Sequence, residues 1–95
     1  MYWQTMIFTV PEAANRMLES LVEIAGGYTL LPMGQGGWMD PWGAAVKEVS
    51  QILLVIHEPD VFGDIHALAS VTARELGEEE IWITTHPVSL AKVTP

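Results

Sequence analysis

The fold is decided by the stretch VSQILLVIH, residues 49–57, which is the longest run of aliphatic and β-branched residues in the chain. Successive side chains of a strand point to opposite faces, so Ser50, Ile52, Leu54 and Ile56 would share one face, and the other residues would share the second. Both faces are mostly apolar, which is typical of a central strand that is covered on both sides. We therefore expect a small sheet that buries its second face against another subunit.

The composition limits the partners that the chain can have. Its 95 residues are enough for one hydrophobic core, and we expect residues 1–95 to form a single domain. Hydrophobic residues make up 49% of the chain and charged residues 17%, which excludes disorder and favours an interface on the surface. The net charge of −8 repels phosphate backbones and anionic membranes, so neither nucleic acid nor a membrane is expected as a partner.

The absence of Cys excludes disulfides and thiolate metal sites. The first ten residues, MYWQTMIFTV, lack the basic region of a signal peptide, and no apolar run approaches the length of a membrane span. We expect a soluble cytoplasmic protein.

The first half of the chain predicts strand, helix, strand and a long loop. Tyr2 to Thr9 has the composition of a strand. A helix follows, with a capping box formed by Thr9 and Glu12, and Gly26 and Gly27 end it. The segment 28–33, YTLLPM, predicts an edge strand, because its proline cannot donate to a ladder. Residues 34–47, GQGGWMDPWGAAVK, are expected to be a loop that is too long for a tight hairpin.

The second half continues with the central strand, a helix and a final strand. Asp60 is a good N-cap for a helix over residues 61–76, which Gly77 ends. The segment 81–86, IWITTH, predicts a strand that Pro87 terminates, and the tail beyond it is expected to add a short fifth strand.

The order of these elements is β-α-β-β-α-β, which predicts an α+β, ferredoxin-like sandwich. Two right-handed split crossovers give an antiparallel sheet of order 4-1-3-2 with both helices on one face. We expect Leu53, Val55 and Trp82 on the bare face of this sheet, together with one alternate set of side chains from the first strand. A monomer rarely exposes such a patch, so self-association is expected.

The segment Trp42 to Ile56, WGAAVKEVSQILLVI, resembles the long hairpin of the CutA and PII-like trimers, in which a Trp-Gly turn leads into a strand rich in Leu and Ile. The resemblance implies a homo-oligomer, a trimer before a dimer, with clefts between its subunits. The chain has His57 where CutA proteins usually have Lys, and it lacks their HPYEVPE-like segment. Signalling PII proteins bind ATP through basic and glycine-rich loops, whereas the turn Gly77 to Glu80 is acidic, so we expect negligible ATP binding.

The loop of residues 34–47 holds the candidate ligand residues. Gly36 and Gly37, with Gly34, could form a backbone nest for an anion, but a phosphate loop normally adds a basic residue, and a structural loop is the alternative. Trp38 and Trp42 could stack on a ligand or anchor an interface, as Trp often does. We therefore expect a ligand or interface site formed by five residues: Gly36, Gly37, Trp38, Trp42 and Glu48.

The remaining reactive side chains are imidazoles. His57 and His86 end two strands, and with Glu58, Asp60 or Glu48 they could form a nitrogen and oxygen site for a divalent metal. Their spacing is not a known ligand motif, and ordinary strand-end histidines are the alternative. No other cofactor is expected.

Three functional interpretations follow. The first is a small PII/CutA-like binding or regulatory protein with sites for a ligand, an ion or a partner at intersubunit clefts. The second is a dimeric α/β-barrel enzyme for a small hydrophobic substrate, with His57 or His86 as acid or base and Trp3 or Trp82 lining the pocket. The third is a structural interaction subunit without a ligand.

Overall fold

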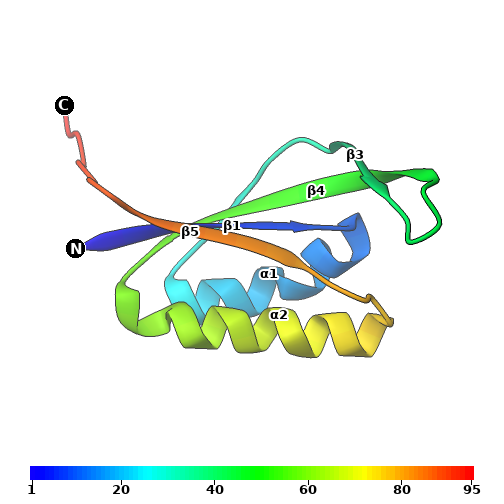
Figure 1. The fold of residues 1–95 in the computed structure, drawn as a ribbon. Coiled ribbons are helices and arrows are strands. Elements are labelled where there is room, and N and C mark those ends of the chain that lie inside the picture. The colour runs from blue at the N-terminus through cyan, green and yellow to red at the C-terminus, as the bar shows by residue number, and fades with distance from the viewer.

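The computed structural model describes all of residues 1–95 and has two layers, a β-sheet and a pair of helices that cover one of its faces (Figure 1). The α+β ferredoxin-like class is confirmed. The elements in chain order are β1 Tyr2–Thr9, α1 Pro11–Ala25, β2 Thr29–Leu30, β3 Gly34–Met39, β4 Ala45–His57, the 3-10 turn η1 Pro59–Val61, α2 Phe62–Leu76 and β5 Trp82–Val88.

The sheet is antiparallel and has the order β2-β4-β1-β5, with the long strand β4 and its neighbour β1 in the interior. This order differs from the predicted one by an additional strand, β3, which pairs with the first half of β4. Strands β2 and β3 are separated by Pro32, which has no N–H to donate. The predicted strand of residues 28–33 is therefore reduced to Thr29–Leu30.

The core lies between the sheet and the helices. It is formed by eight buried residues: Ile7, Ala14, Met17, Leu21, Leu53, Val55, Ile65 and Ala69. The prediction that Leu53 and Val55 lie on the bare face is wrong, because both are fully buried against the helices. The same face of β4 also carries the polar residues Gln51 and His57, which a sequence pattern assigns to the exposed side. Gln51 and His57 share the helix-covered face, where hydrogen bonds satisfy both side chains.

The ends of the helices match the sequence at their C-termini only. Helix α1 follows Val10, and no side chain caps it, so the capping box of Thr9 and Glu12 is wrong. Asp60 is likewise not an N-cap, because it lies in the 3-10 turn and α2 begins at Phe62. Each helix ends at a left-handed glycine, Gly26 with φ 87° and Gly77 with φ 68°.

Strand β5 runs through Pro87 to Val88, so the proline does not terminate it. A proline is tolerated there because β5 is the last strand of the sheet and has one free edge. Residues 89–95 form no strand, in contrast to the prediction of a short fifth strand in the tail.

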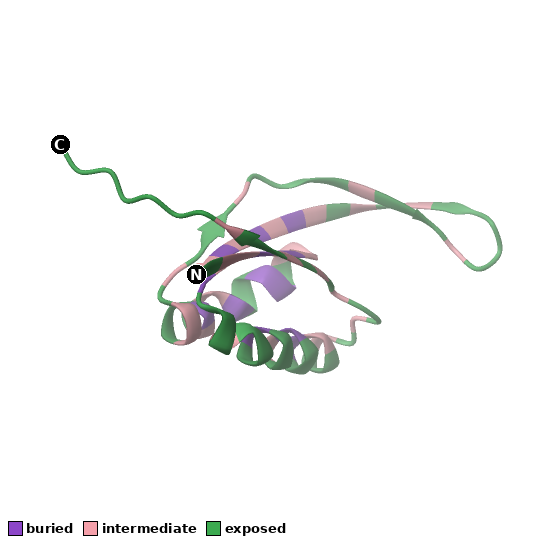
Figure 2. Ribbon diagram, turned by 60° about the vertical axis from the view of Figure 1, so that its left-hand side comes forward, coloured by how far each residue is buried: buried purple, intermediate pink, exposed green.

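The segment predicted to be a loop, residues 34–47, is a β-hairpin arm. We define the arm as β3, the turn of residues 40–44, and residues 45–50 of β4. Figure 2 shows the arm extending past the helices, with most of its surface exposed. The arm and the C-terminal tail extend at opposite ends of the molecule, whose extents are 52 × 26 × 20 Å. The glycines of the arm conceal the alternation by which a strand is recognised.

Candidate functional site

The face of the sheet away from the helices is largely apolar, and its residues are partly exposed. The register places Phe8 between Ile52 and Trp82, and Met6 beside Leu54, on this face. Trp82 is 67% exposed there, in agreement with its predicted position. We call this surface the open face, and its apolar members are Met6, Phe8, Ile52, Leu54, Ile56 and Trp82.

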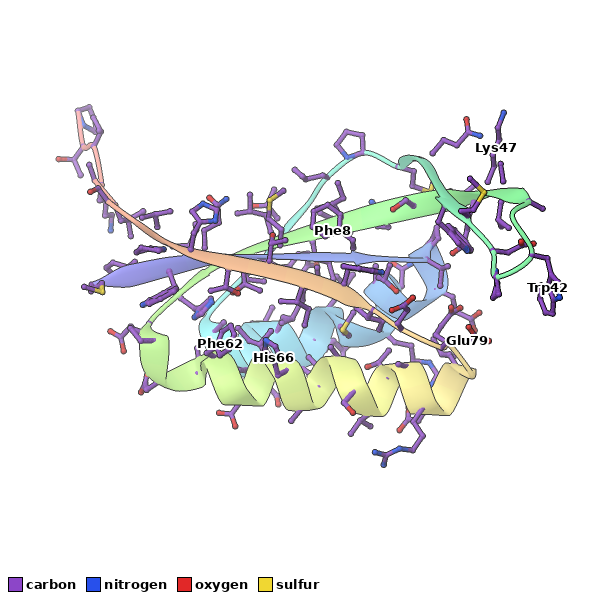
Figure 3. All side chains as sticks on the ribbon, viewed as in Figure 1. Phe8, Trp42, Lys47, Phe62, His66 and Glu79 are labelled. Carbon is purple, nitrogen blue, oxygen red and sulfur yellow. The ribbon has the colours of Figure 1, made fainter.

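The arm carries the predicted ligand residues away from the body of the molecule. Gly36 pairs with Glu48, and Trp38 pairs with Val46, on the face that continues the open face past Ser50. Gly37 pairs with Lys47 on the opposite face. Figure 3 shows Trp42 and Lys47 near the end of the arm, away from the helices.

The turn at the end of the arm is built by Asp40, which the sequence interpretation did not single out. Its Oδ1 accepts hydrogen bonds from the backbone N–H of Trp42 at 2.9 Å and of Ala44 at 2.8 Å. Gly43 takes the left-handed conformation that the turn needs, with φ 85°. Together they present Trp42, which is 89% exposed. The Asp-Pro-Trp-Gly sequence is itself a turn signal that could have revealed the hairpin.

A buried polar chain crosses the sheet under the helices. His57 is 2% exposed; its Nε2 lies 2.6 Å from Thr5 Oγ1, which in turn lies 2.9 Å from Thr85 Oγ1. His57 Nδ1 lies 2.7 Å from the carbonyl oxygen of Glu58, which can only accept, so Nδ1 carries a hydrogen. In a neutral ring Nε2 then accepts from Thr5, and Thr5 accepts from Thr85. Both ring nitrogens are used in holding the structure.

His57 and His86 are not brought together. His86 lies on the open side of β5, where its Nε2 is 3.4 Å from Gln4 Nε2, whereas His57 lies on the helix-covered side. The sheet separates the two rings, so one ion cannot bind both within a chain. No group of three His, Asp or Glu residues gathers in a geometry that could hold a metal ion. Glu48, on the arm, is remote from both rings.

A shallow groove lies between α2 and the beginning of β5. Its volume is about 630 Å³, and Ala69, Ala73 and Ile83 contribute to its apolar lining. The acidic run of residues 78–80 also borders it. The outer edge of β5 beside this groove has no strand partner, because β5 is the last strand of the sheet. No helix is long and apolar enough to cross a membrane.

Solved structures show the same fold. The divalent cation tolerance protein CutA1 from Thermus thermophilus superposes with a TM-score of 0.75 at 19% identity, over 97% of this chain and 88% of that one. The periplasmic divalent cation tolerance protein CutA from Archaeoglobus fulgidus gives a TM-score of 0.79 at 14% identity, with the same coverage of 97% and 88%.

The PII-like protein CutA from Nostoc sp. PCC 7120 gives a TM-score of 0.70 at 17% identity, over 90% of this chain and 80% of that one. No protein-family model and no curated protein matches the sequence. These likenesses confirm the predicted resemblance in three dimensions: the chain has the ferredoxin-like fold of the CutA and PII-like proteins.

Proposed function

We propose that this chain is a small oligomeric binding or regulatory protein, a trimer before a dimer, whose ligand sites lie in clefts between subunits. The observation that carries the proposal is the open face. Six large apolar side chains share it on the side of the sheet away from the helices; five are partly exposed and Trp82 is 67% exposed. Burial of such a surface stabilises by about 25 cal/mol per Å², so further copies of the same chain are the simplest cover.

The arm supplies the wall of the proposed cleft. Trp38 is 49% exposed and Trp42 is 89% exposed, although each ring would gain by leaving water. Both residues extend from the body on a hairpin whose turn is fixed by hydrogen bonds to Asp40. Their exposure is therefore part of an ordered structure. In an oligomer, the arm of one copy would reach the body of the next.

The proposed ligand is a small molecule or a divalent cation. Gly36, Gly37 and Glu48 lie side by side on the arm, where a carboxylate faces a strand that has almost no side chains. Solved proteins of this fold include ones named for divalent cation tolerance, which favours testing cations first. A carboxylate from each of several copies would supply the oxygen ligands that hard cations prefer.

The experiment compares Leu54→Glu with the matched change Val71→Glu by sedimentation velocity at micromolar concentration. Leu54 lies on the open face, whereas Val71 is 44% exposed on α2, on the other side of the molecule. We expect the parent and Val71→Glu to sediment as one oligomer and Leu54→Glu to dissociate. A monomeric parent, or an intact Leu54→Glu oligomer, would contradict the proposal.

A further inference from the structure

The open face becomes polar toward one end of the body. Phe8 lies opposite Trp82, whereas two rows further along the same face Gln4 lies opposite His86. On its other side Gln4 lies opposite Ile56, and the side chain of His86 is exposed. An imidazole therefore lies at the border of the apolar surface that the proposed oligomer buries.

His86 differs from the other two histidines of the chain. Both ring nitrogens of His57 make hydrogen bonds under the helices. The ring of His66 packs on Phe62, with centroids 4.2 Å apart, and belongs to helix α2 on the covered side of the sheet. His86 is therefore the one imidazole on the surface that the copies would share.

The contact with Gln4 can hold His86 in a state that binds a metal. The two Nε2 atoms are 3.4 Å apart, and Gln4 is the only side-chain partner of His86. A half-turn of the amide places its oxygen where its nitrogen lies, and this oxygen then accepts a hydrogen bond from the imidazole Nε2–H. Nδ1 is left with a lone pair. Imidazoles that bind metals commonly donate their other N–H to such an acceptor, which fixes the orientation of the ring.

Burial of the open face would place this imidazole in an apolar environment. The same row and the next row of the face hold Ile56, Met6 and Leu54, which donate no hydrogen bond. A polar group that becomes buried destabilises the assembly unless it gains a partner. Since the chain supplies only Gln4, the second ring nitrogen needs a partner from outside the chain.

Rotational symmetry multiplies the imidazole. In a cyclic oligomer, every copy places the same residue at the same distance from the axis and at the same level. Three imidazoles with an open fourth position form a donor set that binds Zn²⁺ in proteins. Imidazole nitrogen also suits Cu²⁺ and Ni²⁺, whereas Mg²⁺ and Ca²⁺ prefer oxygen ligands.

The charges of the chain favour a cation at this place. The net charge of −8 creates a field that attracts cations. Strands β1 and β5 contain no Lys or Arg, and the one basic residue of β4, Lys47, lies on the opposite face of the arm. A cation bound at His86 therefore meets no positive side chain from the sheet.

We propose that the His86 imidazoles of three copies converge at the axis of the proposed trimer and bind one transition-metal ion there, Zn²⁺, Cu²⁺ or Ni²⁺. Gln4 orients each ring as a positioning residue. This site rests on the proposed oligomer. It differs from the cation site proposed at the arm in its donors, which are nitrogen atoms of the sheet and not the carboxylate oxygens of Glu48.

The first experiment counts the bound ions. The full chain is dialysed against Zn²⁺, with Mg²⁺ in excess to occupy oxygen sites, and sedimentation gives the number of chains per oligomer. We expect one Zn²⁺ per three chains. One Zn²⁺ per chain, no bound Zn²⁺ or a dimeric parent would overturn the site and leave the proposed function standing. A monomeric parent removes both.

His86→Ala and His66→Ala are a matched pair, because each removes one exposed imidazole per chain and only His86 lies on the open face. We expect His86→Ala to weaken Zn²⁺ binding by more than about 100-fold, since it removes every protein ligand. Gln4→Ala should weaken binding by about 10- to 100-fold, as loss of the hydrogen-bond partner of a ligand typically does. His66→Ala should bind like the parent. Equal binding by the two histidine variants contradicts the site.

The spectrum of Cu²⁺ bound to the parent oligomer gives a second measurement that needs no variant. Electron paramagnetic resonance shows a splitting from the nitrogen atoms that bind Cu²⁺, and we expect the pattern of several equivalent imidazoles. A spectrum without nitrogen splitting, or with the splitting of a single imidazole, overturns the site even if His86→Ala fails to assemble.

Discussion

Between Gln51 and His57, every second residue of β4 is buried, whereas between Ala45 and Ser50 none is. The even-numbered residues from Val46 to Ile56 are partly buried in both regions, whereas the odd-numbered residues are exposed in the arm and buried in the body. The two regions therefore differ on the one face of the strand that the helices cover in the body. In the body, the helices and β1 complete the burial. In the arm, the strand has only β3 beside it.

The comparison separates the part of the chain whose apolar side chains are buried within the chain from the part whose apolar side chains stay exposed and available to another molecule. The body has a closed core and a satisfied polar chain under its helices. The arm has two exposed tryptophans, three glycines in β3 and a free strand edge. Substitutions in the core of the body should change the unfolding of the chain, and those in the arm or on the open face should change mainly its association. Four predictions test that division.

The largest effect is expected in the core. Leu53→Ala removes a fully buried side chain from the sheet side of the core, and the cavity should lower the free energy of unfolding by about 2–5 kcal/mol. Met39→Ala, on the arm, is the control, since Met39 is 67% exposed and its loss should change that free energy little. Urea titrations of the two variants give the difference. If Leu53→Ala and Met39→Ala lose similar amounts of unfolding free energy, the proposed distinction between body and arm is wrong.

A smaller effect is expected in the polar chain. Thr5→Val keeps the shape of the side chain but leaves His57 Nε2 and the hydroxyl of Thr85 without this partner. Leaving buried polar groups unpaired should destabilise the body by about 1–3 kcal/mol. Thr84→Val, on the exposed side of β5, is the control. A neutral Thr5→Val would show that the chain of hydrogen bonds does not hold the body together.

A local effect is expected at the turn of the arm. Asp40→Ala removes the acceptor of two backbone hydrogen bonds, each worth about 1 kcal/mol. We expect faster amide hydrogen exchange in β3 and in residues 45–50, with exchange in the core of the sheet unchanged. If the melting temperature of the whole chain falls as much as in Leu53→Ala, the arm and the body form a single cooperative unit.

The smallest effect is expected on the outer surface of the helices. Arg16 and Glu75 form an ion pair at 3.2 Å that joins α1 to α2, but their side chains are 51% and 54% exposed. Exposed pairs are worth about 0.2–1 kcal/mol. Arg16→Ala should therefore shift the urea midpoint only slightly, and high salt should reduce even that shift. A loss as large as that of Thr5→Val would mean that the helices depend on this pair.

The architecture of the body could be predicted because its elements follow local rules. The central strand was visible in the apolar run of residues 49–57, and Gly26 and Gly77 marked where the helices end. The faces of that strand could not be assigned, since hydrogen bonds let Gln51 and His57 occupy the buried side. A polar side chain of a strand can lie on the buried face when a hydrogen-bond partner is available there.

The candidate site was harder to predict than the fold. The side chains of Trp38 and Trp42 indicate an interface or ligand role, but the glycines of β3 carry no side chains. The alternation typical of a strand is therefore absent from β3, and its sequence predicts a loop where the structure has a hairpin. His57 ends β4 and His86 lies within β5, and they pair with adjacent residues of β1, Trp3 and Gln4, which places the two rings on opposite faces of the sheet. Thr5 became relevant only through contacts that join distant strands.

The turn at Asp40 also bears on the order in which the arm and the body fold. It lets the arm close between neighbouring segments, whereas the body must join residues as far apart as Thr5 and His57, 52 positions, or Gln4 and His86, 82 positions. A hairpin forms in about 1–10 μs, and long-range pairing is far slower. We therefore expect the arm to close before the body is complete. Incompletely folded chains at high concentration are then expected to associate through their arms.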